Sequence, residues 1–250
     1  SGSSDANFGS LAAQKVAVTN ADNDSPSITV SAISNHTAET GTQATFTIVL
    51  NTQPTGDVTI PLSSNDLTEG TISVASVTFT SANWNTPQTI TVTGVNDAVI
   101  DGDITYDIVT GAATSTDNNY NNLARADVVV INDDNDLAGF TLSKLTANTN
   151  ESGTSDNFTV VLEAQPNSDV VIDITNGDAT EGTLSTTQIT FTSANWNIPQ
   201  PVTVTGKDDA IADGNITYDV TASVNSGSSD ANFGALAAQT VAVTNADNDS

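Results

Sequence analysis

Cysteine is absent from the 250 residues, so disulfides and thiolate chemistry are excluded. Basic residues are almost as scarce, because four Lys and Arg stand against 30 Asp and Glu and give a formal net charge of −26. A field of this sign repels nucleic acid and anionic membrane surfaces and attracts cations. No apolar run approaches the roughly 18 residues of a membrane-spanning helix. We therefore expect no nucleic-acid partner and no membrane insertion by this segment.

The chain repeats itself at two scales. Ser1–Ser25 and Ser226–Ser250 differ at only two positions, Ser10 against Ala235 and Lys15 against Thr240. Between them lie two longer units, in which most equivalent positions, such as Trp84 and Trp196, are 112 residues apart. This pattern is typical of a tandem array. We expect the C-terminal strands of a preceding repeat at 1–25, one repeat at 26–136 and another at 137–250.

The alternation of apolar and polar residues predicts short strands and no helix. Phe46, Ile48 and Leu50, for example, recur at every second position, which is the period of a strand with one buried face. The same pattern predicts seven strands in the first repeat, at 27–33, 43–50, 57–62, 72–80, 89–94, 104–109 and 127–131. Seven strands in about 110 residues predict an all-β fold, a seven-stranded Greek-key sandwich of the immunoglobulin-like type. The second repeat predicts another sandwich, placed end to end with the first.

Acidic residues occur in the loops that such a sandwich brings to one end. Successive strands run in opposite directions, so the loops after the first, third and fifth strands share a pole with the end of the seventh. In the first repeat this pole holds nine carboxylates: Glu39, Asp66, Glu69, Asp97, Asp101, Asp103, Asp133, Asp134 and Asp136. The second repeat places there Glu151, Asp178, Glu181, Asp208, Asp209, Asp213, Asp247 and Asp249. The opposite pole of the first repeat has only Asp57 and Asp117.

Carboxylates gathered at one pole destabilise the fold unless something neutralises them. Only Lys207 lies near these loops, which leaves a metal ion as the counter-charge. Oxygen ligands select a hard cation and favour Ca²⁺ over Mg²⁺, whereas one histidine and no cysteine argue against zinc. An EF-hand does not fit, because the twelfth position from Asp134 is Leu145 and that from Asp97 is Ile108. The alternative interpretation is that single acids cap turns, above all Asp66, Glu69, Asp178 and Glu181.

The order of these elements resembles a known repeat family. A strand ending in INDDND, followed by LAGFTLS and NESGTSDNFTVVL, is similar to the Calx-beta repeat of sodium–calcium exchangers and bacterial surface proteins, as is the loop VNDAVIDGDITYDI. The resemblance implies a Calx-beta-like sandwich that binds several Ca²⁺ ions at one end of the domain. Two features depart from the exchanger type, since the loop has fewer acids and Asp103 becomes Asn215. The SANWN turns and the Thr-rich composition are more similar to repeats of giant bacterial adhesins.

The candidate metal ligands follow from the acidic pole and from the resemblance together. In the segment 1–25 they are Asp22 and Asp24. In the first repeat they are Glu39, Asp97, Asp101, Asp103, Asp133, Asp134 and Asp136. In the second repeat they are Glu151, Asp208, Asp209, Asp213, Asp247 and Asp249.

The junction between the repeats is short, because Asp136 is followed at once by Leu137 and the next predicted strand. A Ca²⁺ cluster there would set the angle between neighbouring repeats. We therefore expect a calcium-stiffened extender segment of a large bacterial adhesin, extracellular or on the cell surface. We expect no enzymatic activity, because no Ser-His-Asp set, nucleophile elbow or phosphate loop is present.

Three alternatives remain open. The chain could be a repeat subunit of an extracellular filament, sheath or surface layer, in which the segment 1–25 pairs with an identical chain. It could bind surface glycans or proteins directly, with Trp84 or Trp196 stacked on a sugar, although a Trp in such a turn more often plugs the end of the sandwich. It could also be an accessory module of a secreted hydrolase.

Overall fold

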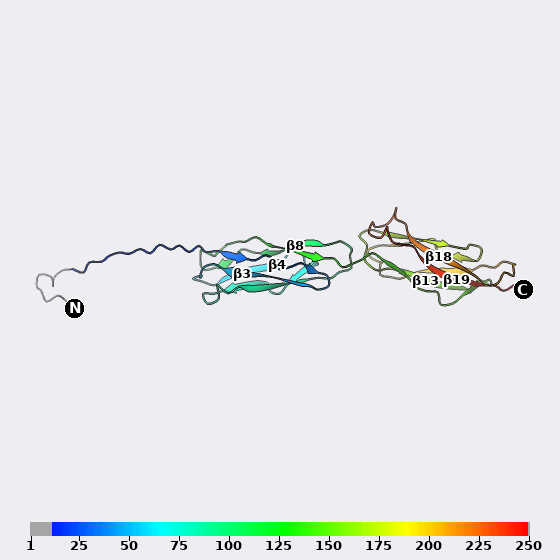
Figure 1. Ribbon diagram of the computed structural model, residues 1–250, viewed down its shortest axis with the longest axis horizontal. Helices are drawn as coiled ribbons and strands as arrows, with labels where there is room; N and C mark the ends of the chain where they lie inside the picture. The colour runs from blue at the N-terminus through cyan, green and yellow to red at the C-terminus, as the bar shows by residue number, and fades with distance from the viewer. Residues whose placement is uncertain (1–11, 250) are drawn as a thin grey trace.

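The protein consists of two β-sandwiches that lie end to end, with Ala12–Ser25 as extended chain ahead of the first (Figure 1). The structure is a computed structural model and describes residues 12–249. No helix in this part of the chain is long and apolar enough to cross a membrane. The expected all-β fold of tandem sandwiches is confirmed.

The first sandwich has two facing sheets. One contains, in spatial order, β1 (Ile28–Val30), β3 (Gln43–Leu50), β7 (Gln88–Gly94) and β5 (Gly70–Ile72). The other contains β2 (Thr37–Ala38), β10 (Val128–Asp133), β8 (Ile104–Thr110), β4 (Val58–Ser64) and β6 (Ser76–Phe79), and β9 (Thr114–Ser115) pairs with β4. All pairings are antiparallel except the parallel contact of β10 with β2.

The second sandwich repeats this arrangement. Its first sheet contains β11 (Phe140–Leu142), β13 (Ser155–Leu162), β17 (Gln200–Gly206) and β15 (Gly182–Leu184). Its second sheet contains β12 (Thr149–Asn150), β19 (Gln239–Ala246), β18 (Ile216–Val224), β14 (Val170–Asn176) and β16 (Gln188–Phe191). The last long strand, β19, lies between β12 and β18 and is therefore an interior strand of its sheet.

The period-two residues fill the space between the sheets. Phe46 and Ile48 on β3 and Val58 and Ile60 on β4 belong to one cluster of buried side chains. At about 1.5–3 kcal/mol for each fully buried side chain, this burial is the main force that holds the sheets together. The second sandwich has an equivalent core of buried side chains. Each sandwich thus carries its own core and presents its loops at two poles.

Two details of the strands differ from the prediction. The strand expected at 72–80 is two strands, because the chain leaves β5 in one sheet and crosses to β6 in the other. The strands β2, β9 and β12 were not expected, since a two-residue strand carries no readable alternation. Trp84 and Trp196 are half-buried against their cores, as expected of side chains that plug the end of a sandwich.

The two cores differ at one buried position. Tyr120 is fully buried, and its hydroxyl donates to Thr52 O at 2.7 Å and accepts from Thr52 N at 3.2 Å. In the second sandwich Phe233 occupies the corresponding turn and is also fully buried. The first sandwich therefore depends on a buried hydroxyl that the second lacks.

We expect Tyr120→Phe to lower the unfolding free energy of the first sandwich by about 1–2 kcal/mol, because it leaves the Thr52 backbone without its partner. Urea unfolding followed by Trp84 fluorescence measures this change, and the transition of the second sandwich serves as the internal reference. An unchanged transition of the first sandwich would show that water replaces the hydroxyl without cost.

Candidate metal centres

The first acidic group of the first sandwich lies where β10 ends. Glu39 comes from the loop after β2, and Asp134 and Asp136 follow β10, with one carboxylate oxygen of each within 4.8 Å of the others. Asn135 N donates to Glu39 Oε2 at 3.1 Å, and Asp136 N donates to Asp134 Oδ1 at 2.7 Å. Glu39 is only 4% exposed, which is unusual for an acid without a cationic partner.

A second acidic group adjoins the first at the same pole. Glu69, from the loop between β4 and β5, meets Asp97 and Asp101 from the loop between β7 and β8, again within 4.8 Å. Glu69 is 6% exposed, and its Oε2 accepts from Asn132 Nδ2 at 3.2 Å. Loops remote in sequence therefore converge at one pole, as the strand directions predict.

The second sandwich repeats both groups. Glu151 meets Asp247 and Asp249, and Glu181 meets Asp209 and Asp213. The supporting hydrogen bonds recur as well. Asn248 N donates to Glu151 Oε2 at 2.9 Å, and Asn245 Nδ2 donates to Glu181 Oε2 at 3.2 Å. The residues described thus contain four groups of three carboxylates, each of which could hold a metal ion.

A glycine in each long acidic loop orients one of the carboxylates. Gly102 has a φ of 75°, in the region that side chains disfavour, and its N–H donates to Asp134 Oδ2 at 2.8 Å. Gly214 has a φ of 77° and donates in the same way to Asp247 Oδ2 at 2.7 Å. These two contacts tie the long loop of each sandwich to the acids that follow its last strand.

The electrostatics of the pole favour proton or cation uptake. Burial raises the pKa of Glu39 to about 7, the charges of Asp134 and other nearby acids add to the increase, and the Asn135 N–H bond opposes it. Burial followed by neighbouring carboxylates also raises the pKa of Glu69, Asp101 and Asp136. The direction of these shifts means that holding the pole fully ionised costs free energy.

In the second sandwich the hydrogen bond from Asn248 N lowers the pKa of Glu151. Burial and the charges of Asp247, Asp209 and Asp249 outweigh that bond, so the net pKa of Glu151 is raised. The buried glutamate of the second sandwich is therefore destabilised in its ionised form by burial and by neighbouring carboxylates, as Glu39 is in the first.

The donor set fits a hard cation. All the ligand atoms are carboxylate oxygens, and Asp136 Oδ2 is buried without a hydrogen-bond partner in the described structure. Between residues 12 and 249, the one basic side chain within 4.0 Å of a carboxylate is His36, which meets Asp133 and none of the four groups. A cation at these groups would satisfy the orphan oxygen and neutralise the pole.

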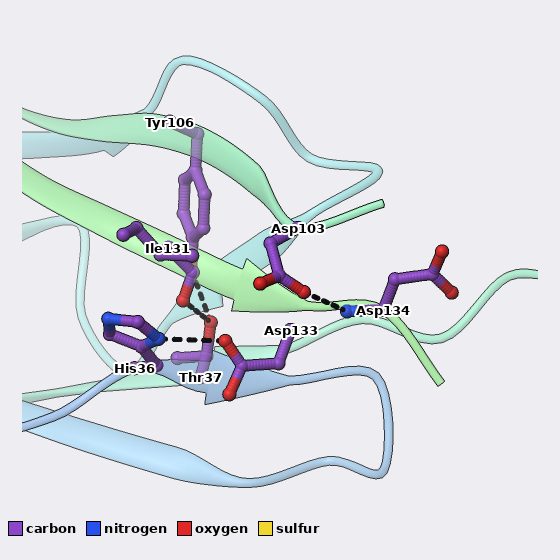
Figure 2. Close-up of polar contacts among 7 residues, drawn as sticks. All are labelled: His36, Thr37, Asp103, Tyr106, Ile131, Asp133 and Asp134. Atoms are coloured by element: carbon purple, nitrogen blue, oxygen red, sulfur yellow. Dashed lines mark hydrogen bonds and ion pairs between the residues drawn. The ribbon is translucent and has the colours of Figure 1, made fainter. Parts of the chain in front are cut away.

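Of the fifteen candidate ligands, those in the four groups are Glu39, Asp97, Asp101, Asp134, Asp136, Glu151, Asp209, Asp213, Asp247 and Asp249. Three others lie beside the groups and make different contacts. Asp133 Oδ1 lies 2.7 Å from His36 Nδ1, and Asp103 Oδ1 accepts from Asp134 N at 3.1 Å (Figure 2). Asp208 Oδ1 accepts from Asn248 Nδ2 at 3.4 Å.

The remaining candidates, Asp22 and Asp24, lie in the extended segment. Asp24 N donates to Asp22 Oδ1 at 3.0 Å, the same local turn that Asp134 and Asp136 form. No third carboxylate joins them within the part of the chain that the structure describes.

Two members of the groups, Glu69 and Glu181, were attributed to turns rather than included among the ligands. The turns are instead capped by Asp66 and Asp178, whose Oδ1 atoms accept from the N–H and hydroxyl of Thr68 and Thr180. These bonds lower the pKa of Asp66 and of Asp178. The Glu-Gly-Thr sequence shared by both repeats at the acidic pole was the available signal for the two glutamates.

The loop that carries Asp97 and Asp101 also contacts the second sandwich. Gln165 N donates to Ala98 O at 2.6 Å, and Val99 and Gln165 form a parallel bridge. Two asparagine side chains of the second sandwich bind the carbonyl of Ile100. Asn167 Nδ2 and Asn232 Nδ2 donate to Ile100 O at 2.7 and 3.3 Å. The Ile100 side chain packs against the core of the second sandwich. We call Ala98–Ile100 the docking loop.

Comparison with known proteins gives only distant structural similarity. No family model matches the sequence, and no curated protein matches it. A crystal structure of the calcium-binding domain CBD12 of CALX1.1 is 12% identical, with 78% of each chain covered and a TM-score of 0.34. CBD12 from CALX1.2 is 14% identical, with 73% of each chain covered and a TM-score of 0.31. Domains 4–9 of the surface layer protein SbsC are 18% identical, with 89% of this chain and 32% of that chain covered and a TM-score of 0.25. These overlaps bear on neither ligand nor function.

We expect the metal-free protein to become more stable as the pH falls from about 7.5 to about 5. The folded-state pKa of Glu39 exceeds the ordinary value of 4.5, so the folded protein holds the Glu39 proton more tightly than the unfolded chain does. The stabilisation from this proton is complete below pH 4.5 and is lost as the pH rises through about 7. The change for this group is at most about 3 kcal/mol. Thermal unfolding of the first sandwich across this range measures it, and Glu39→Gln should flatten the profile. Stability that rises with pH over this range would contradict the buried-acid account.

Proposed function

We propose that the chain is a stretch of non-enzymatic extender repeats from a large bacterial extracellular or cell-surface adhesin, and that Ca²⁺ stiffens the junctions between repeats. The observation that carries the proposal is the docking loop. Asp97 and Asp101 belong to an acidic group, and the three residues between them bind the next sandwich. One short loop therefore connects the charge state of a pole to the position of the neighbouring repeat.

The counter-ion that suits these sites best is Ca²⁺. Each group combines acids from two separate loops, and Ca²⁺ tolerates the irregular, flexible geometry that results, whereas Mg²⁺ requires a near-ideal octahedron. Dissociation constants of about 10⁻⁴–10⁻³ M are usual for extracellular Ca²⁺ modules. Sites of that strength would fill outside a cell and stay empty inside it.

The short connection between the sandwiches supports a rod. Three residues separate Asp136 from Phe140, the first residue of β11, and the docking loop adds contacts beside this connection. Without a cation, the acids around the docking loop repel one another and loosen its hydrogen bonds to the next sandwich. With a cation bound, the loop is held in place and the repeats keep one relative orientation.

We expect Ca²⁺ to raise the melting temperature and to narrow the range of inter-sandwich angles, because it binds the folded pole and not the unfolded chain. At a free concentration of 100 times the dissociation constant the gain is about 2.7 kcal/mol per site. Calorimetric titration and small-angle scattering with and without chelator measure the two effects. The double change Glu39→Gln and Glu69→Gln should remove the response of the first sandwich, whereas Asp57→Asn, at the opposite pole, should preserve it. Equal responses of the two variants would refute a metal at these groups.

We expect the double change Asn167→Ala and Asn232→Ala to separate metal binding from stiffening. Both side chains donate to Ile100 O, and neither is an acid of the pole. The variant should still bind Ca²⁺, since its carboxylates are intact, but scattering should show an angular spread close to that of the chelated protein. A Ca²⁺-induced narrowing as large as that of the parent chain would mean that the docking loop does not transmit the effect.

A further inference from the structure

One sheet of each sandwich is almost free of charged residues, although the chain carries 30 acids. In the first sandwich the strands of the sheet β1–β3–β7–β5 contain none. In the second, the strands of the sheet β11–β13–β17–β15 contain only Asp156, which is half-buried. The Asp156 carboxylate caps a turn, because Thr146 N and Ala147 N donate to its Oδ2 at 2.6 and 2.7 Å. Both sandwiches therefore share an uncharged outer surface.

Threonine dominates the outward side of these sheets. Between the buried core positions of β3 and β7, Thr45 lies opposite Thr91. Thr47 lies opposite Thr89 in the same way. The outward positions of the equivalent strands in the second sandwich hold Thr, Ser, Asn, Val and Pro. We call the outward sides of these two sheets the threonine faces.

The other sheet of each sandwich carries acids on its outward side. Asp107 on β8 and Asp219 on β18 alternate with buried neighbours, so their side chains point outward (both strands are labelled in Figure 1). Asp173 on β14 does the same. A second chain packed against such a sheet would bring like charges to about 10 Å from one another, the usual distance between packed sheets.

The threonine faces keep the outward acids of two chains apart. If two threonine faces pack about 10 Å apart, and each sandwich is itself two sheets about 10 Å apart, the acid-bearing sheets lie about 30 Å from each other. The Debye length is about 8 Å at physiological ionic strength, so repulsion over that distance is largely screened. Contact through the acid-bearing sheets places the charges little more than one Debye length apart. Electrostatics therefore favours contact through the threonine faces.

We infer that the threonine faces form a lateral interface whose partner is a second copy of this chain, packed side by side. An uncharged face lets a chain of net charge −26 meet another copy at little electrostatic cost. The paired threonines offer methyl groups for packing and hydroxyls that both donate and accept, so the face is complementary to itself. Since most equivalent positions recur 112 residues apart, each repeat of a neighbouring chain offers a matching face.

The size of a threonine face sets the strength of the contact. With strands about 4.8 Å apart and about 3.3 Å for each residue, one face covers roughly 300 Å². A stable interface buries about 800 Å² on each partner, so one face holds two chains only weakly. Successive repeats add faces along the array, and each further contact forms between chains that are already joined. Lateral association should therefore strengthen as the number of repeats grows.

The absence of cysteine makes a single introduced thiol a probe of which sheets meet. Thr91→Cys places the thiol on β7 in the threonine face, and Thr59→Cys places it on β4 in the opposite sheet, where the native threonine is likewise half-buried. We expect a bismaleimide that spans the roughly 10 Å between packed sheets to join Thr91→Cys chains several times faster than Thr59→Cys chains. Equal rates would overturn the inference.

Two charge variants of equal net charge give the second readout. In the Thr91→Cys background, Thr47→Glu adds an acid to the threonine face, whereas Thr78→Glu adds one to β6 in the other sheet. Because like charges that oppose each other across an interface are strongly unfavourable, Thr47→Glu should slow crosslinking about tenfold, and Thr78→Glu should leave it unchanged. An equal effect of the two changes would mean that net charge alone controls association, against the inference. Melting temperatures check the folding of both variants, and the comparison of the two cysteine variants needs neither.

Sedimentation of the parent chain completes the test. Its weight-average mass should rise as the concentration approaches the millimolar range. A chain that stays monomeric there would overturn the inference and leave the threonine face to another uncharged partner, such as a neutral glycan. All of these measurements are made in chelator, so they are independent of Ca²⁺ at the acidic poles and of the extender proposal.

Discussion

The crowding of carboxylates at one pole of each sandwich is the constraint on which the rest of the structure depends. Glu39, Glu69, Glu151 and Glu181 are all less than a tenth exposed, yet none has a basic partner within 4.0 Å among residues 12–249. Backbone and asparagine N–H groups donate hydrogen bonds to these four glutamates, but these neutral donors do not neutralise the negative charge. Folding therefore brings like charges together and keeps water away from them, which destabilises the folded state. A bound cation or proton offsets this destabilisation.

The acidic pole of the first sandwich lies at the junction with the second. The loop between Asp97 and Asp101 belongs to the acidic pole at both ends, and its middle binds the opposite pole of the next sandwich. A side chain of this loop, Ile100, is part of the packing around the neighbouring core. The contacts between the two sandwiches that involve this loop therefore begin within one residue of two carboxylates of the pole.

The duplicated strand shows how far context outweighs local sequence. Residues 14–21 and β19 have the same apolar alternation and nearly the same composition, so their intrinsic preference for an extended chain is the same. Only the copy that lies between β12 and β18 has its N–H and C=O groups paired and its valines buried. A sheet neighbour, not propensity, completes a strand.

The period of the apolar residues and the order of the acidic loops were enough to predict two β-sandwiches and an acidic pole on each. The strand 43–50 matches β3 at both ends, because eight residues of alternation leave no doubt about which face is buried. Tertiary structure alone decided which acids meet. Glu69 joins Asp97 and Asp101 while the nearby Asp66 caps a turn, and Asp133 turns to His36 while Asp134 joins Glu39. These choices depend on contacts between residues that are far apart in sequence, and the packing of the two sheets sets the distances between them. The shared Glu-Gly-Thr sequence marks the two glutamates but does not say which acids they meet.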